Sequence, residues 1–130
     1  MCDRIAGTNW SRARLLFDDV TNAEADDVIE IDAPDANGIF TGRFKHRDSG
    51  VVLPDQMMNG RCVPDGLRSR VVFTRKHDGV NVTTRYVGRV IPVGGGSTTV
   101  MIRGKFTRAT TDANGSVSIA SGDYETEKPT

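Results

Sequence analysis

The sequence Val-Asn-Val-Thr-Thr-Arg-Tyr-Val-Gly-Arg-Val at residues 80–90 decides the fold of this chain. Its even-numbered positions carry Val, Thr, Tyr and Gly, and its odd-numbered positions carry mostly polar or charged side chains. Alternation with a period of two is typical of a β-strand that buries one face and exposes the other. Turn-forming residues bound this strand, with Asp78-Gly79 before it and three consecutive glycines at 94–96 after it.

The same alternation recurs beyond residue 27, and short turn signals separate the runs. Asp-Ala-Asn-Gly occurs twice, at 35–38 and 112–115, and Asn-Gly favours the tight turn of a hairpin. No helical segment is long enough to connect parallel strands, so we expect an antiparallel sheet. The pattern predicts about eight strands in all. Apart from residues 80–90, we expect them near 6–17, 28–33, 39–45, 57–63, 67–74, 100–106 and 117–125.

Five of the predicted strands contain a glycine followed by a charged residue and then an apolar or aromatic one. Because glycine has no Cβ, a strand can bend sharply there and neighbouring strands can approach closely. Such positions allow a sheet to close, and about eight strands make a barrel that can hold one small ligand. The sequence therefore predicts an all-β fold, an eight-stranded antiparallel up-and-down β-barrel. The triplets start at Gly42, Gly60, Gly88, Gly104 and Gly122.

Length and composition indicate one domain. The chain has 130 residues and a mass of 14.1 kDa, which is usual for a single domain. We expect this domain to span residues 1–130, with an irregular acidic N-terminal part at 1–27 and a frayed tail at 126–130. No apolar run approaches the ~18 residues of a membrane helix, and the N-terminus lacks the apolar core of a signal peptide. A cytoplasmic protein without membrane contact is therefore expected.

Residues that usually carry catalysis or bind metals are few and scattered. Cys2 and Cys62 have no metal-ligand spacing, and we expect both to be free thiols, with a single disulfide as the alternative. His46 and His77 lie 31 positions apart without a ligand-spaced partner, so neither a metal nor another cofactor is expected. No known catalytic motif is present, so we do not expect an enzyme.

Charge is balanced overall, with 17 basic and 17 acidic residues, but residues 1–35 are acidic and the remainder is basic. Many basic side chains fall on the strand positions opposite the predicted core, and there they would form a belt outside the barrel. Only two Tyr and one Trp are available for base stacking, so nucleic acid is not an expected partner. The belt consists of Arg43, Lys45, Arg61, Arg68, Arg70, Arg85, Arg89, Arg103 and Lys105.

Three segments resemble the avidin and lipocalin barrels, which share the calycin-type architecture. Gly-Thr-Asn-Trp at 7–10 is similar to the Gly-x-Trp signature of their first strand, with one extra residue. Ile-Phe-Thr-Gly-Arg-Phe at 39–44 resembles the third avidin strand, and Thr-Thr-Arg-Tyr-Val-Gly at 83–88 resembles the sixth. The resemblance covers nearly the whole chain in strand order and loop position. It implies an avidin-like barrel that binds a small ligand.

The biotin site of that family does not carry over. The resemblance places Phe44 where avidins have the hydroxyl of a Tyr, and His46 where they have a Ser. Thr84 matches the family, but Tyr86 replaces a Trp, and Trp10 is the only Trp in the chain. Each missing hydrogen bond to a buried ureido oxygen would cost about 1–3 kcal/mol. High-affinity biotin binding is therefore not expected.

Two functions are compatible with this sequence. The first is a non-catalytic protein that binds a small, mainly apolar molecule in the barrel interior or mouth. The second is a protein-interaction or structural barrel with a filled interior, which acts through its outer face as a homo-oligomer. The second function would use apolar residues at outward positions, namely Val72, Val87, Ile91 and Met101. For the first function, the predicted ligand-binding residues are Trp10, Phe44, His46, Ser69, Phe73, Thr84 and Tyr86.

Overall fold

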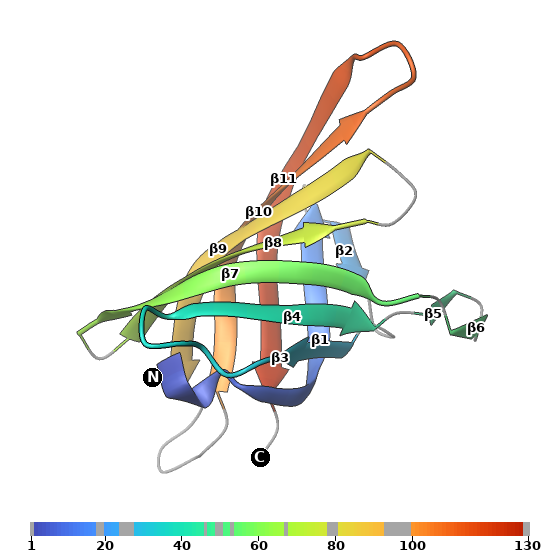
Figure 1. The fold of residues 1–130 in the computed structure, drawn as a ribbon. Coiled ribbons are helices and arrows are strands. Elements are labelled where there is room, and N and C mark those ends of the chain that lie inside the picture. Colours follow the sequence, from blue (N-terminus) through green and yellow to red (C-terminus); the bar gives the residue numbers. More distant parts are fainter. Residues whose placement is uncertain are drawn as a thin grey trace.

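A computed structural model describes residues 2–17, 20–23, 28–45, 47–48, 51–52, 54–66, 68–77, 81–92 and 100–128 (Figure 1). Within these ranges, one short 3₁₀ helix, η1 (Cys2–Arg4), precedes a series of strands. None of the described helices is long and apolar enough to cross a membrane. The strands are β1 (Gly7–Phe17), β2 (Val20–Ala23), β3 (Val28–Ile31), β4 (Ile39–Lys45), β5 (Arg47–Asp48), β6 (Val51–Val52), β7 (Gln56–Asp65), β8 (Arg68–Lys76), β9 (Val82–Pro92), β10 (Val100–Thr111) and β11 (Val117–Lys128).

Nine of these strands form one sheet in the order β11-β10-β9-β8-β7-β4-β3-β1-β2, and β5 pairs only with β6. From β7 to β11, each strand pairs antiparallel with the next strand of the chain, which is an up-and-down topology. The first part of β1 pairs with β3, with Trp10 opposite Ile29. Its second part pairs with β11, with Leu15 opposite Tyr124. The predicted all-β, antiparallel, up-and-down fold is confirmed.

Both ends of the chain are more regular than the sequence suggests. β1 lies inside the segment expected to be irregular, and β11 continues to Lys128, inside the expected tail. The two strands pair with one another, so each satisfies backbone groups of the other. The register of this pairing shifts between Ser11 and Arg14, and such a shift moves side chains to the opposite face. This shift explains why the alternation of polar and apolar residues is hard to recognise at 7–17.

The core lies on the inner face of the curved sheet, where five aromatic rings from five different strands pack together. Each ring is at most 2% exposed. The rings of Phe73 and Tyr86 stack with centroids 4.6 Å apart, and Tyr124 also lies 4.6 Å from Tyr86. Such ring pairs contribute about 0.5–1.5 kcal/mol beyond the burial of their area. The five rings are Phe44 on β4, Phe73 on β8, Tyr86 on β9, Phe106 on β10 and Tyr124 on β11.

Glycines of the repeated triplet lie where neighbouring strands approach closely. A Cβ on Gly60 would lie 2.6 Å from Phe73 Cβ on β8 and 2.7 Å from the end of the Phe40 ring on β4. Side chains do not approach to such distances, so any other residue at this position would push the strands apart. The predicted close approach is confirmed at this glycine.

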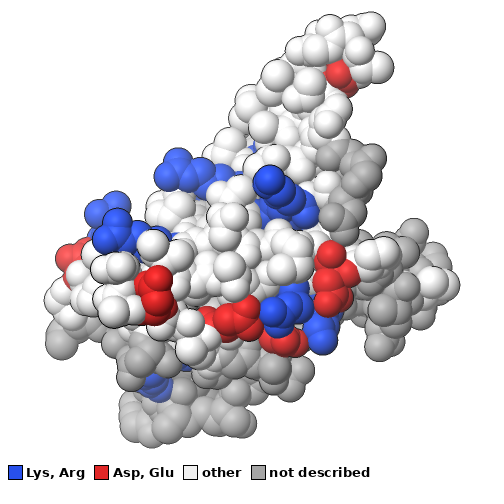
Figure 2. All heavy atoms as spheres, in the orientation of Figure 1, with Lys and Arg blue, Asp and Glu red and all other residues white. Residues whose placement is uncertain are grey.

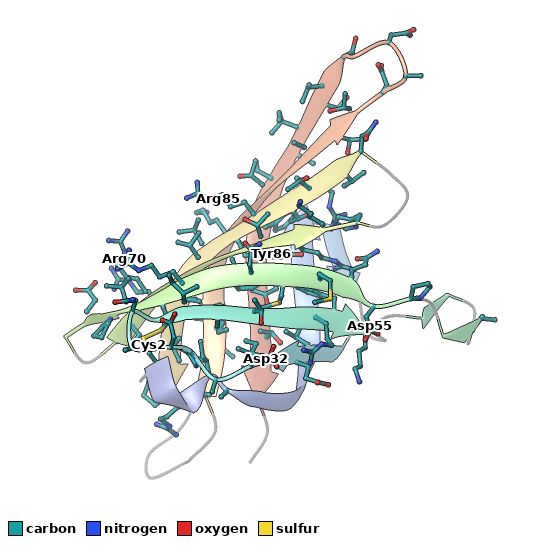
Figure 3. The ribbon with its side chains drawn as sticks, viewed as in Figure 1. Cys2, Asp32, Asp55, Arg70, Arg85 and Tyr86 are labelled. Carbon is teal, nitrogen blue, oxygen red and sulfur yellow. A yellow bond between two sulfur atoms is a disulfide. The ribbon has the colours of Figure 1, made fainter. Side chains whose placement is uncertain are left out.

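Cys2 and Cys62 form a disulfide, so the prediction of two free thiols is wrong (Figure 3). The bond joins η1 to β7, and the Cα atoms lie 5.7 Å apart. The inner face of β7 presents Cys62 near the end of the sheet where η1 lies, and Cys62 is 1% exposed. Because 60 positions separate the two cysteines in the sequence, only the folded sheet brings them together.

The outer face carries charges of both signs rather than a belt of basic residues alone. Figure 2 shows basic and acidic side chains next to one another on the visible face. Arg70 and Arg85 point away from the sheet, while Tyr86 lies within its curve (Figure 3). Ion pairs connect adjacent strands, with Lys105 Nζ 2.9 Å from Asp123 Oδ1 and Arg89 2.7 Å from Asp65 Oδ2. The outer basic residues therefore have acidic neighbours that lower the net charge of this surface.

Candidate functional site

A row of polar side chains crosses the inner face of the sheet near one end. Alternation along β8 places Arg75 on the same face as Val71 and Phe73. Arg75 is directly opposite Thr84 of β9, and Thr84 is directly opposite Arg108 of β10. We call Arg75, Thr84 and Arg108 the polar row. The pleat of three adjacent strands thus places two guanidinium groups and one hydroxyl on the inner face.

A row of aromatic side chains lies two residues further into the sheet. Phe73, Tyr86 and Phe106 follow the polar row on the same face of β8, β9 and β10, and they are likewise opposite one another. We call these three residues the aromatic row. Each is 1% exposed. The polar row therefore forms the border between the aromatic core and the loops at this end of the sheet.

Arg75 is buried and held in a defined orientation. Its side chain is 3% exposed, its Nε donates a hydrogen bond to Gln56 Oε1 at 2.5 Å, and its Cζ lies 4.2 Å from the Phe44 ring centroid. Burying a guanidinium is costly unless hydrogen bonds and favourable electrostatics compensate. A cation over an aromatic face contributes about 0.5–2 kcal/mol, more when it is desolvated. Gln56 and Phe44 therefore orient the guanidinium plane.

Thr84 connects the second half of the site. Its hydroxyl oxygen accepts a hydrogen bond from Arg108 Nε at 2.9 Å and lies 3.0 Å from His77 Nε2, just beyond β8. Thr84 is completely buried, whereas Arg108 and His77 are partly exposed. A hydroxyl has one donor and two acceptor positions, so it can serve both neighbours at once. The site thus extends from buried Arg75 to side chains that solvent reaches.

The structure brings together four of the seven side chains predicted for the site. The Phe44 ring lies 5.8 Å from Tyr86 and 6.3 Å from Phe73, and Thr84 lies next to Tyr86 along β9 on the same face. Ser69 is also buried on the inner face, but it pairs with Val90 at the opposite end of β8. Six residues of strand separate Ser69 from Arg75, which is about 20 Å at ~3.3 Å per residue. Ser69 therefore does not belong to this cluster.

Two predicted residues receive no side-chain assignment. The backbone of Trp10 pairs with Ile29 of β3, which places it in β1, and its side chain is not described. His46 lies outside the described residues. Gln56, Arg75 and Arg108 were not predicted as site residues, because charged side chains are usually assigned to the exposed face. The available signal was the phase of Arg75, which continues the alternation of Ser69, Val71 and Phe73.

Two hollows elsewhere offer less chemistry. A groove of about 390 Å³ beside the disulfide is lined by residues 34–38 and 61–64, and within it Arg61 Nε donates to the Asn37 carbonyl at 3.3 Å. A depression of about 440 Å³ on the outer side of β10 and β11 is lined by two cations and two carboxylates, which pair with one another as Lys105–Asp123 and Arg103–Glu125. No group of His, Cys, Asp or Glu suited to a metal ion occurs among the described residues.

The carboxylates with shifted pKa values also lie on the outer face. Hydrogen bonding from Lys45, together with the charges of Lys45 and Arg43, holds the pKa of Glu30 below its ordinary value despite some desolvation. The pKa of Asp32 is lowered mainly by the hydrogen bond from the Thr41 hydroxyl, at 2.8 Å, with a further contribution from Arg43. Desolvation lowers the pKa of Arg43, but its hydrogen bonds and ion pairs with these two carboxylates raise it overall. These shifts reflect pairing between β3 and β4 and indicate no reactive group.

Comparison with known proteins identifies the architecture. No family model matches the sequence, and no curated protein matches it. Among solved structures, the chain is similar to AVR2, with a TM-score of 0.60 and 15% identity over 93% of this chain and 96% of that one. It is also similar to core-bradavidin, with a TM-score of 0.57 and 17% identity over 95% of this chain and all of the other. The fold is avidin-like.

A third similar structure is that of rhizavidin in complex with biotin, with a TM-score of 0.55 and 16% identity over 90% of this chain and 97% of that one. The resemblance predicted from the sequence is therefore confirmed at the level of the fold. At these identities, the similarity says nothing about which ligand this chain binds.

Proposed function

We propose that this avidin-like protein is a non-catalytic binder of a small molecule, and that the ligand's polar group contacts the polar row. The observation that carries this proposal is the buried guanidinium of Arg75, held between Gln56 and the Phe44 ring on the inner face. A few convergent polar groups beside a large apolar surface are characteristic of small-molecule sites. The aromatic row, immediately below the polar row, supplies that apolar surface.

We further infer that the sheet closes into an eight-stranded barrel. The pairing of β1 with both β3 and β11 supports closure, because it gives each of β1, β3, β4 and β7–β11 two neighbours. Closure would enclose the aromatic core and leave the polar row facing the mouth. About eight strands form a barrel just wide enough for one small ligand.

Tight biotin binding is not part of this proposal. At the position where the resemblance implies a Tyr hydroxyl, Phe44 has no hydroxyl, and the Arg75 guanidinium lies over its ring. A buried cation with its amide partner differs chemically from a set of neutral donors around a ureido oxygen. The expected ligand is therefore one that a guanidinium recognises well.

Thermal-shift measurements on the full chain test the proposal. The probes are biotin and a panel of neutral, anionic and cationic small organic molecules, applied to the wild type, Thr84→Val and Ser69→Ala. We expect at least one probe other than biotin to raise Tm in the wild type and in Ser69→Ala but not in Thr84→Val. A ligand at 100 times its Kd would stabilise the fold by about 2.7 kcal/mol. A panel without any stabilising member would contradict the proposal, as would a shift that Thr84→Val leaves unchanged.

A homo-oligomer that acts through the outer face is the second candidate function. The observation in its favour is a set of exposed apolar side chains, including Val87 at 40% and Met57 at 53%. Isolated apolar residues on a surface are common, whereas contiguous ones usually mark a contact. Light scattering across a wide concentration range tests this candidate, because a monomer at every concentration would rule it out.

The cytoplasmic location expected from the sequence stays a prediction, and the disulfide argues against it. Disulfides persist in oxidising compartments and are rare in the cytosol. We therefore propose an oxidising environment for the mature protein. The redox state of Cys2 and Cys62, measured by mass spectrometry after alkylation at the moment of cell lysis, decides between the two locations.

A further inference from the structure

We propose that the polar row recognises a small organic carboxylate whose apolar part contacts the aromatic core. This inference rests on the proposed function and specifies the chemical class of its ligand. It concerns Arg75, Arg108 and His77, three side chains rich in N–H donors that gather at one end of the inner face.

The charge of the buried groups points to an anion. The buried polar side chains among the described residues are Gln56, Ser69, Arg75, Thr84 and Thr126, and the charged one among them is a cation. Asp55, which precedes Gln56, is exposed to solvent. A fixed cation at the border of a low-dielectric core attracts an anion more strongly than the same cation in water. The electrostatics of this end of the sheet therefore favour a negatively charged ligand group.

The geometry of Arg75 favours a carboxylate among anions. A guanidinium presents its donors in a planar fork that matches the two oxygens of a carboxylate. The bond from Nε to Gln56 and the stacking over Phe44 fix this plane before any ligand arrives. An oriented donor loses less conformational freedom on binding, which increases the affinity it contributes.

The partly exposed side of the site provides a route for the anion. Arg108 reaches Thr84 from β10, and His77 reaches the same hydroxyl from the end of β8. Solvent contacts both Arg108 and His77, whereas Arg75 and Thr84 are buried. An incoming carboxylate would thus meet Arg108 first and Arg75 deeper inside.

The neighbouring aromatic surface accounts for the apolar part of the ligand. Phe44, Phe73 and Tyr86 present rings with centroids 4.6–6.3 Å apart, directly adjoining the polar row. An inorganic anion would gain nothing from these rings, whereas an aryl group would stack on them or contact their edges. The expected ligand class is therefore an aromatic or otherwise apolar monocarboxylate.

Isothermal titration calorimetry with two isosteric probes tests the proposal. 3-Phenylpropionate carries the carboxylate, and 3-phenylpropionamide has the same body without the charge. We expect the acid to bind the full chain at least tenfold more tightly than the amide. Arg75→Gln should abolish this preference, and Arg108→Gln should reduce it. Ser69→Ala, on the inner face at the opposite end, should leave both affinities unchanged and serves as the matched control.

The variants and a third probe keep the outcomes distinct. If Arg75→Gln does not fold, Arg108→Gln decides, because Arg108 is partly exposed and its replacement leaves the core intact. Inorganic phosphate that binds as tightly as 3-phenylpropionate would overturn the assignment of an organic carboxylate. Equal binding of acid and amide, lost in Thr84→Val, would overturn the anion class and leave the proposed function standing. Failure of both probes, together with every member of the wider panel, would overturn both proposals.

Discussion

Gly88 and Gly104 face each other across β9 and β10, where the two backbones are so close that neither position has room for a side chain. A Cβ on Gly88 would lie 2.5 Å from the Arg103 carbonyl oxygen and 3.3 Å from the Cα of Gly104. A Cβ on Gly104 would lie still closer to the Val87 carbonyl oxygen. The pair lies one step beyond Tyr86 and Phe106, so it sets the curvature of the sheet beside the aromatic row.

Gly104→Ala should therefore destabilise the protein. The added methyl group meets backbone atoms of β9, which can move only if the strands separate, and overpacking of this kind costs about 1–3 kcal/mol. Urea unfolding followed by circular dichroism measures the change. Thr107→Ala, an exposed position of the same strand, is the control, and we expect it to stay within about 0.5 kcal/mol of the wild type. Equal stability of Gly104→Ala and the wild type would refute the close approach.

Reduction of the Cys2–Cys62 disulfide should lower the free energy of unfolding substantially. The bond closes a loop of 60 residues, and the chain-entropy model gives about 4 kcal/mol for a loop of this length. Urea unfolding with and without a reductant measures the difference, and Cys2→Ser should show the same loss without any reductant. Titration of two free thiols in the folded, unreduced protein would mean that the bond does not form.

Acid should weaken the pairing of β3 with β4. Glu30 has its pKa held below its ordinary value of 4.5, and Asp32 and Asp65 have theirs held below 3.8. The folded protein binds fewer protons at these groups than the unfolded chain, so their contribution is present above about pH 4.5 and is lost as the pH falls through the folded pKa values.

Unfolding curves between pH 6 and pH 3 check this expectation, with Arg43→Gln as the comparison. That variant removes the cation between Glu30 and Asp32, so its stability should depend less on pH in the acid range. The effect should be modest, because exposed ion pairs contribute little and salt screens them. A steeper acid loss in Arg43→Gln than in the wild type would contradict the assigned pairing.

Biotin should bind weakly or not at all. We expect calorimetry to give a Kd no tighter than about 1 μM, equivalent to −8.2 kcal/mol. The physical reason is the absence of the hydroxyl at Phe44 and the presence of the Arg75 cation over its ring. Nanomolar affinity would show that the site accommodates the ureido group by contacts other than those expected.

The parts of the fold that depend on local chemistry were predictable from the sequence. Both Asp-Ala-Asn-Gly segments form the same turn, in which Asp35 and Asp112 accept hydrogen bonds from the amides two and four residues later. Gly38 and Gly115 take positive φ values of 79° and 83° in these turns. Such geometry follows from the side chains within four residues, so one sequence suffices to predict it.

Features that depend on distant residues were missed. Cys2 meets Cys62 only because β7 and η1 lie at the same end of the sheet. Arg75 is an inner residue because Gln56, 19 positions earlier, and the Phe44 ring together stabilise its charge. Since neither partner is recognisable from the sequence around Arg75, the site was predicted as mainly apolar, whereas the structure gives it a polar border.

Chemical-shift mapping on ¹⁵N-labelled protein tests the central claim, that small molecules bind at the polar row, most directly. During a titration with 3-phenylpropionate, we expect the backbone amides of Gln56, Arg75, Thr84 and Arg108 to shift together, while that of Ser69 stays in place. Saturable shifts confined to these inner positions would support the account. Shifts confined to the outer face, or none at millimolar ligand, would contradict it.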